Sequence, residues 1–171
     1  MNLEDFDMTD YSLENLKESD KWIVTKLNLL IQNVRNHMEK YEFNVVGSEI
    51  YSFIWDDFCD WYIELAKINM DNTTKSVLIY TLENILKLLH PFMPYVTEEI
   101  YQMLPIKEEE SIMISNYPKY SKKYIFELEE EVVDDEIEFI RSFRNVKAEN
   151  NITKDMKVMF DTTDDNDLIV K

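Results

Sequence analysis

Apolar residues recur at helical spacing along most of the chain. In the segment DKWIVTKLNLLIQNVRNHMEKY (20–41) they form one stripe along a helix of about five turns. Ser19 or Asp20, at the start of this segment, suits the N-cap position. The pattern therefore predicts a first long amphipathic helix. Its stripe contains Ile23, Leu27, Leu30, Ile31, Val34, Met38 and Tyr41.

Further segments with the same periodicity follow, separated by short connections. Helices are expected at about 43–71, 73–90 and 94–104. The second of these should end where His90 precedes proline, because a residue before proline is pushed out of the α region. Pro94 suits the first turn of the next helix, since its φ is already fixed near the helical value. Together the segments predict an all-α protein built as an antiparallel four-helix bundle.

The rest of the chain predicts a connector and one more helix. Residues 105–126 look irregular, with an extended piece expected at 111–114. A fifth amphipathic helix is expected at about 127–149.

The last residues indicate a small α/β appendage. KVMF (157–160) alternates polar and apolar residues as a strand does. The final DLIVK (167–171) is an apolar run that stops before it is complete, from which we expect a piece of a longer protein. We therefore predict a helical bundle over residues 1–118. An incomplete α/β unit of connector, helix and strand follows over residues 119–171.

Composition supports long helices and indicates the cellular compartment. The 171 residues include one glycine and four prolines, where average usage would supply roughly a dozen glycines. Tight turns and β-rich folds are thereby disfavoured. The single cysteine, Cys59, excludes an internal disulfide, and the sequence has neither a signal peptide nor an apolar run long enough to span a bilayer. We expect a cytoplasmic protein that does not contact membranes.

The segment WDDFCDWYIELAK (55–67) is the densest cluster of chemically reactive side chains. On a helix its apolar residues share one face and its acids mostly another, so Trp55 and Trp61 are expected in the core. A carboxylate metal site would need a histidine at helical spacing, and a cysteine nucleophile would need a general base. His37 and His90 have no such motif around them, and no glycine-rich phosphate loop is present. We predict a helical binding module with no catalytic residue and no metal site.

Two motifs resemble a known family. FCDWYIELAK (58–67) and LLHPFMPYVTEEIYQML (88–104), with DKWIVTKL (20–27), are similar to the anticodon-binding domain of the valyl-tRNA synthetases, which are class I aminoacyl-tRNA synthetases. The second motif is shared with the isoleucine and leucine enzymes, so the same domain of an isoleucyl- or leucyl-tRNA synthetase remains an alternative. IRSFRNVKAE (140–149) resembles the region that follows the bundle in this family.

The resemblance implies a domain that binds the anticodon stem-loop of tRNA(Val). It would position that tRNA for ATP-dependent aminoacylation by a separate catalytic domain. The implied partners are this catalytic domain and an editing domain of the same polypeptide, in a monomeric valine–tRNA ligase. The family's HIGH and KMSKS motifs, which bind ATP, are absent from this sequence. We therefore expect no cofactor in this chain and no aminoacylation by it alone, with ATP bound elsewhere in the full-length enzyme.

Unpaired anticodon bases are recognised by stacking and by hydrogen bonds to their edges. Trp22 is the preferred stacking residue, since it lies one residue outside the first apolar stripe and is flanked by Lys21 and Lys26. Asn33 lies further along roughly the same face. The alternative is that Trp22 closes the end of the bundle core.

Basic residues form two further groups. Arg141, Arg144 and Lys147 recur every three residues in the fifth expected helix, a basic strip suited to tRNA phosphates. Cations near a helix C-terminus are favourable in any case and pair with nearby glutamates, which explains this strip equally well. The connector carries the other group, for which a solvated loop is the default interpretation: Lys119, Lys122 and Lys123.

The net charge of −17 argues against non-specific binding to nucleic acid. It supports an alternative of another class, an acidic helical module that binds proteins and has no RNA role. The position of Trp22 discriminates between the two. An exposed Trp22 beside a basic surface favours RNA binding, whereas a buried Trp22 on a uniformly acidic face favours the protein-binding module.

Overall fold

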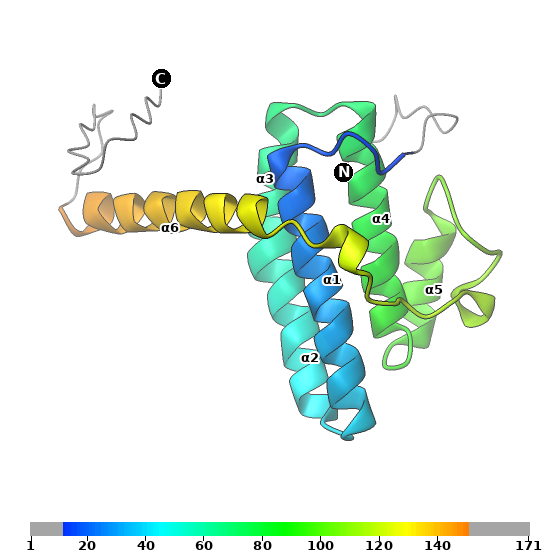
Figure 1. Ribbon diagram of the computed structural model, residues 1–171. Helices are drawn as coiled ribbons and strands as arrows, with labels where there is room; N and C mark the ends of the chain where they lie inside the picture. Colours follow the sequence, from blue (N-terminus) through cyan, green and yellow to red (C-terminus); the bar gives the residue numbers. More distant parts are fainter. Residues whose placement is uncertain (1–11, 151–171) are drawn as a thin grey trace. The chain divides into compact units, whose positions relative to one another are not determined.

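The computed structural model describes residues 12–150, and this part of the chain is helical, with no strand (Figure 1). The predicted all-α class is confirmed. The strand predicted at 157–160 and the apolar run at 167–171 lie outside the described residues. The helices are α1 (Glu18–Glu39), α2 (Phe43–Ser52), the π-helix η2 (Phe53–Tyr62), α3 (Ile63–Ile68), α4 (Asn72–Leu89), α5 (Pro94–Gln102), the 3₁₀ turns η3 (Ile112–Ile114) and η4 (Lys122–Tyr124), and α6 (Glu127–Glu149).

Helix α1 lies beside the continuous run α2–η2–α3 and beside α4, with α5 packed on α4 (Figure 1). Successive long helices run in opposite directions, as expected of a bundle with short connections. The stripe predicted along α1 is buried from Ile23 to Val34, whereas Met38 is partly buried and Tyr41, beyond the end of α1, is 80% exposed. Each buried side chain of the stripe contributes roughly 1.5–3 kcal/mol through removal from water. The bundle core therefore forms along the predicted face of α1.

The run α2–η2–α3 was predicted as one regular helix, but its middle is π-helical. Within a π-helix the hydrogen bonds join residues five apart, so side chains rotate more slowly around the axis than in an α-helix. Phe53 and Phe58 are both buried at that spacing. Trp61 is buried as predicted, whereas the prediction of a buried Trp55 is wrong, because 52% of its surface is exposed. The changed helical period turns Trp55 outward.

Prolines and a cap set the ends of α4 and α5. Asp71 precedes α4 and accepts a hydrogen bond from the Thr74 backbone N–H (2.9 Å), which satisfies one of the free donors at the helix start. Helix α4 ends at Leu89, and α5 begins at Pro94, both as predicted from the proline positions. The extended piece predicted at 111–114 is wrong, since residues 112–114 form the 3₁₀ turn η3.

A buried polar network ties the start of α1 to η2 and α4. Asp20 is fully buried and accepts hydrogen bonds from the Tyr62 hydroxyl (2.7 Å) and the Thr74 hydroxyl (3.4 Å). Burial raises the pKa of Tyr62, and the charge and hydrogen bond of Asp20 raise it further. Tyr62 therefore stays protonated and donates to Asp20. The network fixes how these helices meet, because a buried carboxylate without donors would be costly.

The chain divides into two compact units, residues 1–135 and 136–171. The connector and the start of α6 belong to the first unit, although the predicted division lies between residues 118 and 119. Within the described ranges, no helix has the length and apolar character needed to cross a membrane.

Candidate nucleic-acid interface

The structure places Trp22 inside the first unit. Its side chain is 1% exposed, and Nε1 donates a hydrogen bond to Asp134 Oδ1 (2.9 Å) from the first part of α6. The alternative interpretation, in which Trp22 closes the core, therefore describes the structure. No ring face of Trp22 is available for a base to stack on.

The lysines beside Trp22 are held by acids of α6. Lys26 Nζ lies 2.6 Å from Asp134 Oδ2 and 3.2 Å from Glu130 Oε1, and Lys21 Nζ lies 2.6 Å from Glu129 Oε1. Burial alone would lower the pKa of Lys26, but Asp134 and Glu130 outweigh it and raise that pKa. Both lysines predicted to contact RNA beside Trp22 are thus engaged in ion pairs within the protein.

The other predicted contacts belong to different units of the chain. Asn33 is exposed on α1 in the first unit. Arg141 and Arg144 are exposed and Lys147 is half-buried on the part of α6 that belongs to the second unit. The RNA contacts predicted from the sequence are therefore divided between the two units.

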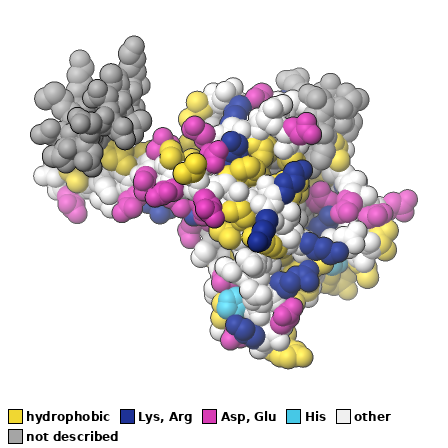
Figure 2. Space-filling view, in the orientation of Figure 1, with side chains coloured by type: hydrophobic (Ala, Val, Ile, Leu, Met, Phe, Trp, Pro, Cys, Tyr) yellow, Lys and Arg dark blue, Asp and Glu magenta, His cyan; other side chains and the backbone are white. Residues whose placement is uncertain are grey.

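A different basic group is assembled where the connector crosses α1. We call it the connector cluster; it consists of Arg35, Lys119, Lys122 and Lys123, all exposed. Among residues 12–150 no carboxylate lies within ion-pair distance of any of them. Figure 2 shows Lys and Arg side chains gathered over this part of the face. In a chain of net charge −17, these cations are a local basic surface.

Side chains of α1 hold the connector in place. Asn28 pairs with the Ser121 backbone through two hydrogen bonds, donating from Nδ2 to the carbonyl (2.8 Å) and accepting from the N–H (2.9 Å). Thr25 Oγ1 accepts from the Phe126 N–H (3.0 Å), and Arg35 Nη2 donates to the Pro118 carbonyl (3.4 Å). These contacts fix the lysines of the connector beside Arg35 of α1. The connector lysines are exposed, as expected of a solvated loop, while the backbone of the connector is docked on α1.

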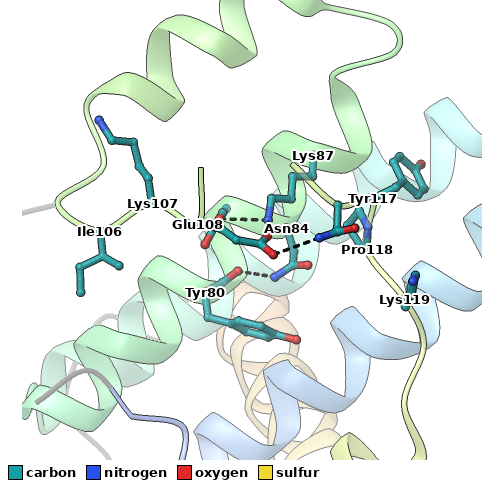
Figure 3. A pocket seen from close by; sticks show the side chains of 11 residues that line it. Tyr80, Asn84, Lys87, Ile106, Lys107, Glu108, Tyr117, Pro118 and Lys119 are labelled. Atoms are coloured by element: carbon teal, nitrogen blue, oxygen red, sulfur yellow. Dashed lines mark hydrogen bonds and ion pairs between the residues drawn. The ribbon is translucent and has the colours of Figure 1, made fainter. Parts of the chain in front are cut away.

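A pocket of about 620 Å³ lies between α4 and the connector, next to the connector cluster (Figure 3). On its α4 side Lys87 is 6% exposed and bridges Glu83 (3.0 Å) and Glu108 of the connector. Burial alone would lower the pKa of Lys87, but the two carboxylates outweigh it and raise that pKa. Lys119 lines this pocket as well as belonging to the connector cluster.

Two other walls of the pocket come from α4. Asn84 Nδ2 donates to the Tyr80 carbonyl (2.8 Å), one turn earlier. Burial, with smaller effects of Tyr124 and Glu83, raises the pKa of Tyr80 to about 12, so its hydroxyl is protonated at neutral pH. The described residues contain no group of His, Cys, Asp and Glu arranged to hold a metal ion.

The sequence of this chain matches a known protein family. Residues 20–161 match the family described as the anticodon-binding domain of tRNA ligase. The chain is 50% identical to the valine–tRNA ligase of Listeria innocua over 88% of its length and 18% of the relative's. It is 41% identical to that of Thermotoga maritima over its whole length and 20% of the relative's. It is 44% identical to that of Staphylococcus aureus over 96% of its length and 20% of the relative's. The chain thus spans about a fifth of these relatives' length.

Proposed function

This chain belongs to the family of tRNA-ligase anticodon-binding domains, and we propose that it binds the anticodon stem-loop of tRNA(Val) as part of a valine–tRNA ligase. The names of its relatives support valine over isoleucine and leucine. The proposed setting is a monomeric cytoplasmic enzyme.

The connector cluster is the observation that carries the proposal for this chain's own residues. Arg35 and the connector lysines offer charges that no carboxylate of the described part of the chain neutralises. Affinity for RNA comes largely from such cations, because each phosphate contact releases condensed counterions. The same cluster disfavours the acidic protein-binding module. Trp22 is buried, as that module requires, but the surface is not uniformly acidic.

The proposed contribution to mechanism is positional. ATP, valine activation and editing belong to the catalytic and editing domains of such an enzyme. Binding energy gained at the anticodon, far from the reacting centre, holds the tRNA so that its acceptor end is correctly oriented. In the proposed function the chain itself forms and breaks no covalent bond.

An NMR titration tests the proposal. The isotope-labelled 171-residue chain is titrated at low salt with a valine anticodon stem-loop and, separately, with a stem-loop whose anticodon is replaced. We expect shifts at Lys119–Lys123 and along α1 near Arg35, larger with the valine loop. Equal shifts with both loops would reduce the function to backbone binding. A folded chain that shows no shifts with either loop would contradict RNA binding.

A further inference from the structure

The corner between α1 and α2 closes with a Schellman cap, a common way for an α-helix to end (Figure 1). The Glu42 N–H donates to the His37 carbonyl (2.9 Å), and the Tyr41 N–H donates to the Met38 carbonyl (3.1 Å). The residue in the left-handed conformation is usually glycine, but here it is Tyr41, at a φ of 62°. A side chain at such a φ is strained, so the corner depends on contacts that hold it closed.

Charged side chains stand where such a cap commonly has an apolar contact. That contact joins the two positions that His37 and Glu42 occupy here. Instead, His37 Nδ1 lies 2.6 Å from Glu42 Oε2, and His37 Nε2 lies 3.4 Å from Glu49 Oε1 of α2. All three side chains are partly buried. We call this group the His37 clasp; a single imidazole in it bridges the turn and α2.

The protonation state of the ring decides how many of these contacts are hydrogen bonds. Both ring nitrogens donate in the imidazolium form, whereas the neutral ring has one donor and one acceptor. An ionised carboxylate only accepts, so a neutral His37 turns a lone pair toward one of its two glutamates. Histidine ordinarily changes its charge between about pH 5 and 8, a range in which glutamate carboxylates are ordinarily ionised.

Glu49 has little besides His37 to hold its charge. Its Oε2 is buried and accepts no hydrogen bond, and its Oε1 has the His37 ring as its one ion-pair partner among residues 12–150. Within the same residues, no third carboxylate lies within ion-pair distance of the ring. On α1 itself the charged neighbours Glu39 and Lys40 are exposed. Loss of the ring proton therefore acts directly on the contact between α1 and α2.

The corner held by the His37 clasp carries exposed aromatic rings. Tyr41 is 80% exposed and Phe43 is 47% exposed. Their ring centroids lie 6.2 Å apart, and that of Phe43 lies 6.5 Å from that of Phe92, which follows α4. This aromatic row joins the α1–α2 corner to the corner between α4 and α5. Its geometry depends on the backbone of residues 41–43, which the cap fixes.

We propose that the His37 clasp is a pH-sensitive switch that fixes the α1–α2 corner, and with it the aromatic row, while the ring is protonated, and loosens both when the ring is neutral. The protonated form is the one that gains a second hydrogen bond in the folded chain. The hold is therefore complete at low pH and is lost as pH rises. The proposal concerns the corner alone and stands or falls independently of RNA binding.

Amide hydrogen exchange, followed by NMR on the 171-residue chain, tests the proposal. Protection factors, which correct for the intrinsic pH dependence of exchange, are measured between about pH 5.5 and 8.5. Those of the Tyr41 and Glu42 amides should fall about ten-fold with rising pH, the effect of losing one hydrogen bond to a charged group. The Leu104 amide, at the end of α5, should change less than about two-fold. The nuclear Overhauser contact between the Phe43 and Phe92 rings should weaken in parallel. Protection at Tyr41 and Glu42 that does not vary with pH overturns the proposal.

Matched variants assign the pH dependence to the His37 clasp, each checked for folding by thermal unfolding. His37→Gln cannot change its charge, and its protection at the corner should be independent of pH. His90→Gln, which replaces the other histidine of the chain, should keep the wild-type fall. Glu49→Gln, whose amide can donate to the neutral ring, should show a smaller fall than the wild type. A wild-type fall retained by His37→Gln, or lost in His90→Gln, would contradict the proposal.

Discussion

At the scale of single residues, Asp71 joins a helix cap to an ion pair. Its carboxylate lies 2.6 Å from Lys17 Nζ and accepts from the Thr74 N–H. Burial alone would raise the pKa of Asp71, but the hydrogen bonds from Lys17 and Thr74 outweigh it and lower that pKa. A lowered pKa means that the stabilisation is present above the unfolded-state pKa of about 4 and is lost as pH falls through the folded-state pKa.

Asp71→Asn keeps a good cap but removes the charge. We expect it to lower the free energy of unfolding by about 0.5 kcal/mol at pH 7, since the pair is partly exposed, with the difference shrinking as pH falls below about 4. Urea unfolding from pH 7 down to the lowest pH at which both chains fold measures this. Asp71→Ala, which also loses the cap, should cost about 1 kcal/mol more. A difference for Asp71→Asn that does not change with pH would contradict the assignment.

Sequence-based prediction was least successful for the contacts of single residues. Periodicity places Trp22 at the border of the apolar stripe, where the spacing fits a buried side chain and an exposed one equally. What decides is Asp134, 112 positions away, which accepts the indole N–H. Arg35 was missed for the same reason, because its neighbour Pro118 is 83 positions away. Local spacing carries no information about such pairs.

At the scale of elements, the prediction was closest where local rules act alone. The fifth expected helix, 127–149, coincides with α6 (Glu127–Glu149), and the expected 73–90 and 94–104 differ from α4 and α5 by at most a few residues. Proline and amphipathic periodicity are local signals. The π-helical stretch η2 and the docked connector were not predicted, since both depend on packing against other elements.

The connector is the element whose attachment can be tested most directly. Asn28→Ala removes both hydrogen bonds to Ser121. We expect faster amide hydrogen exchange in residues 119–124 by roughly ten-fold, because loss of two partly buried hydrogen bonds favours local opening by about 1–3 kcal/mol. RNA affinity should fall with it, since the connector lysines are no longer held beside Arg35.

Asn36→Ala is the control for this change. Asn36 is an exposed residue of the same helix with no hydrogen bond from its side chain in the described structure. It should leave hydrogen exchange in the connector unchanged. Equal exchange rates in the wild-type chain and Asn28→Ala would show that other contacts hold the connector.

At the scale of the whole molecule, a net charge of −17 has to be reconciled with binding a polyanion. Salt screening separates the repulsion by the net charge from the attraction by nearby cations. Charges further apart than the Debye length, about 10 Å at 0.1 M salt, interact weakly. The overall acidity then acts mainly as a long-range repulsion that salt removes, while the connector cluster acts at contact. Affinity should still fall as salt rises above 0.1 M, with the counterions released at each phosphate contact setting the slope.

Four cations on a mostly single-stranded loop predict a slope of about −3 for the logarithm of affinity against the logarithm of salt concentration. Lys122→Ala/Lys123→Ala should reduce it to about −1.5. Lys40→Ala/Lys67→Ala removes the same amount of charge from exposed positions outside the cluster and should keep the wild-type slope. Fluorescence anisotropy of a labelled stem-loop between 0.1 and about 0.4 M salt gives all three slopes. At these salt concentrations long-range repulsion is screened and direct contacts with phosphates dominate. Because both variants make the chain equally more acidic, a slope that changes in the first alone can only come from contacts at the cluster. Equal slopes in the two variants would instead mean that net charge governs binding and that the connector cluster does not touch the RNA.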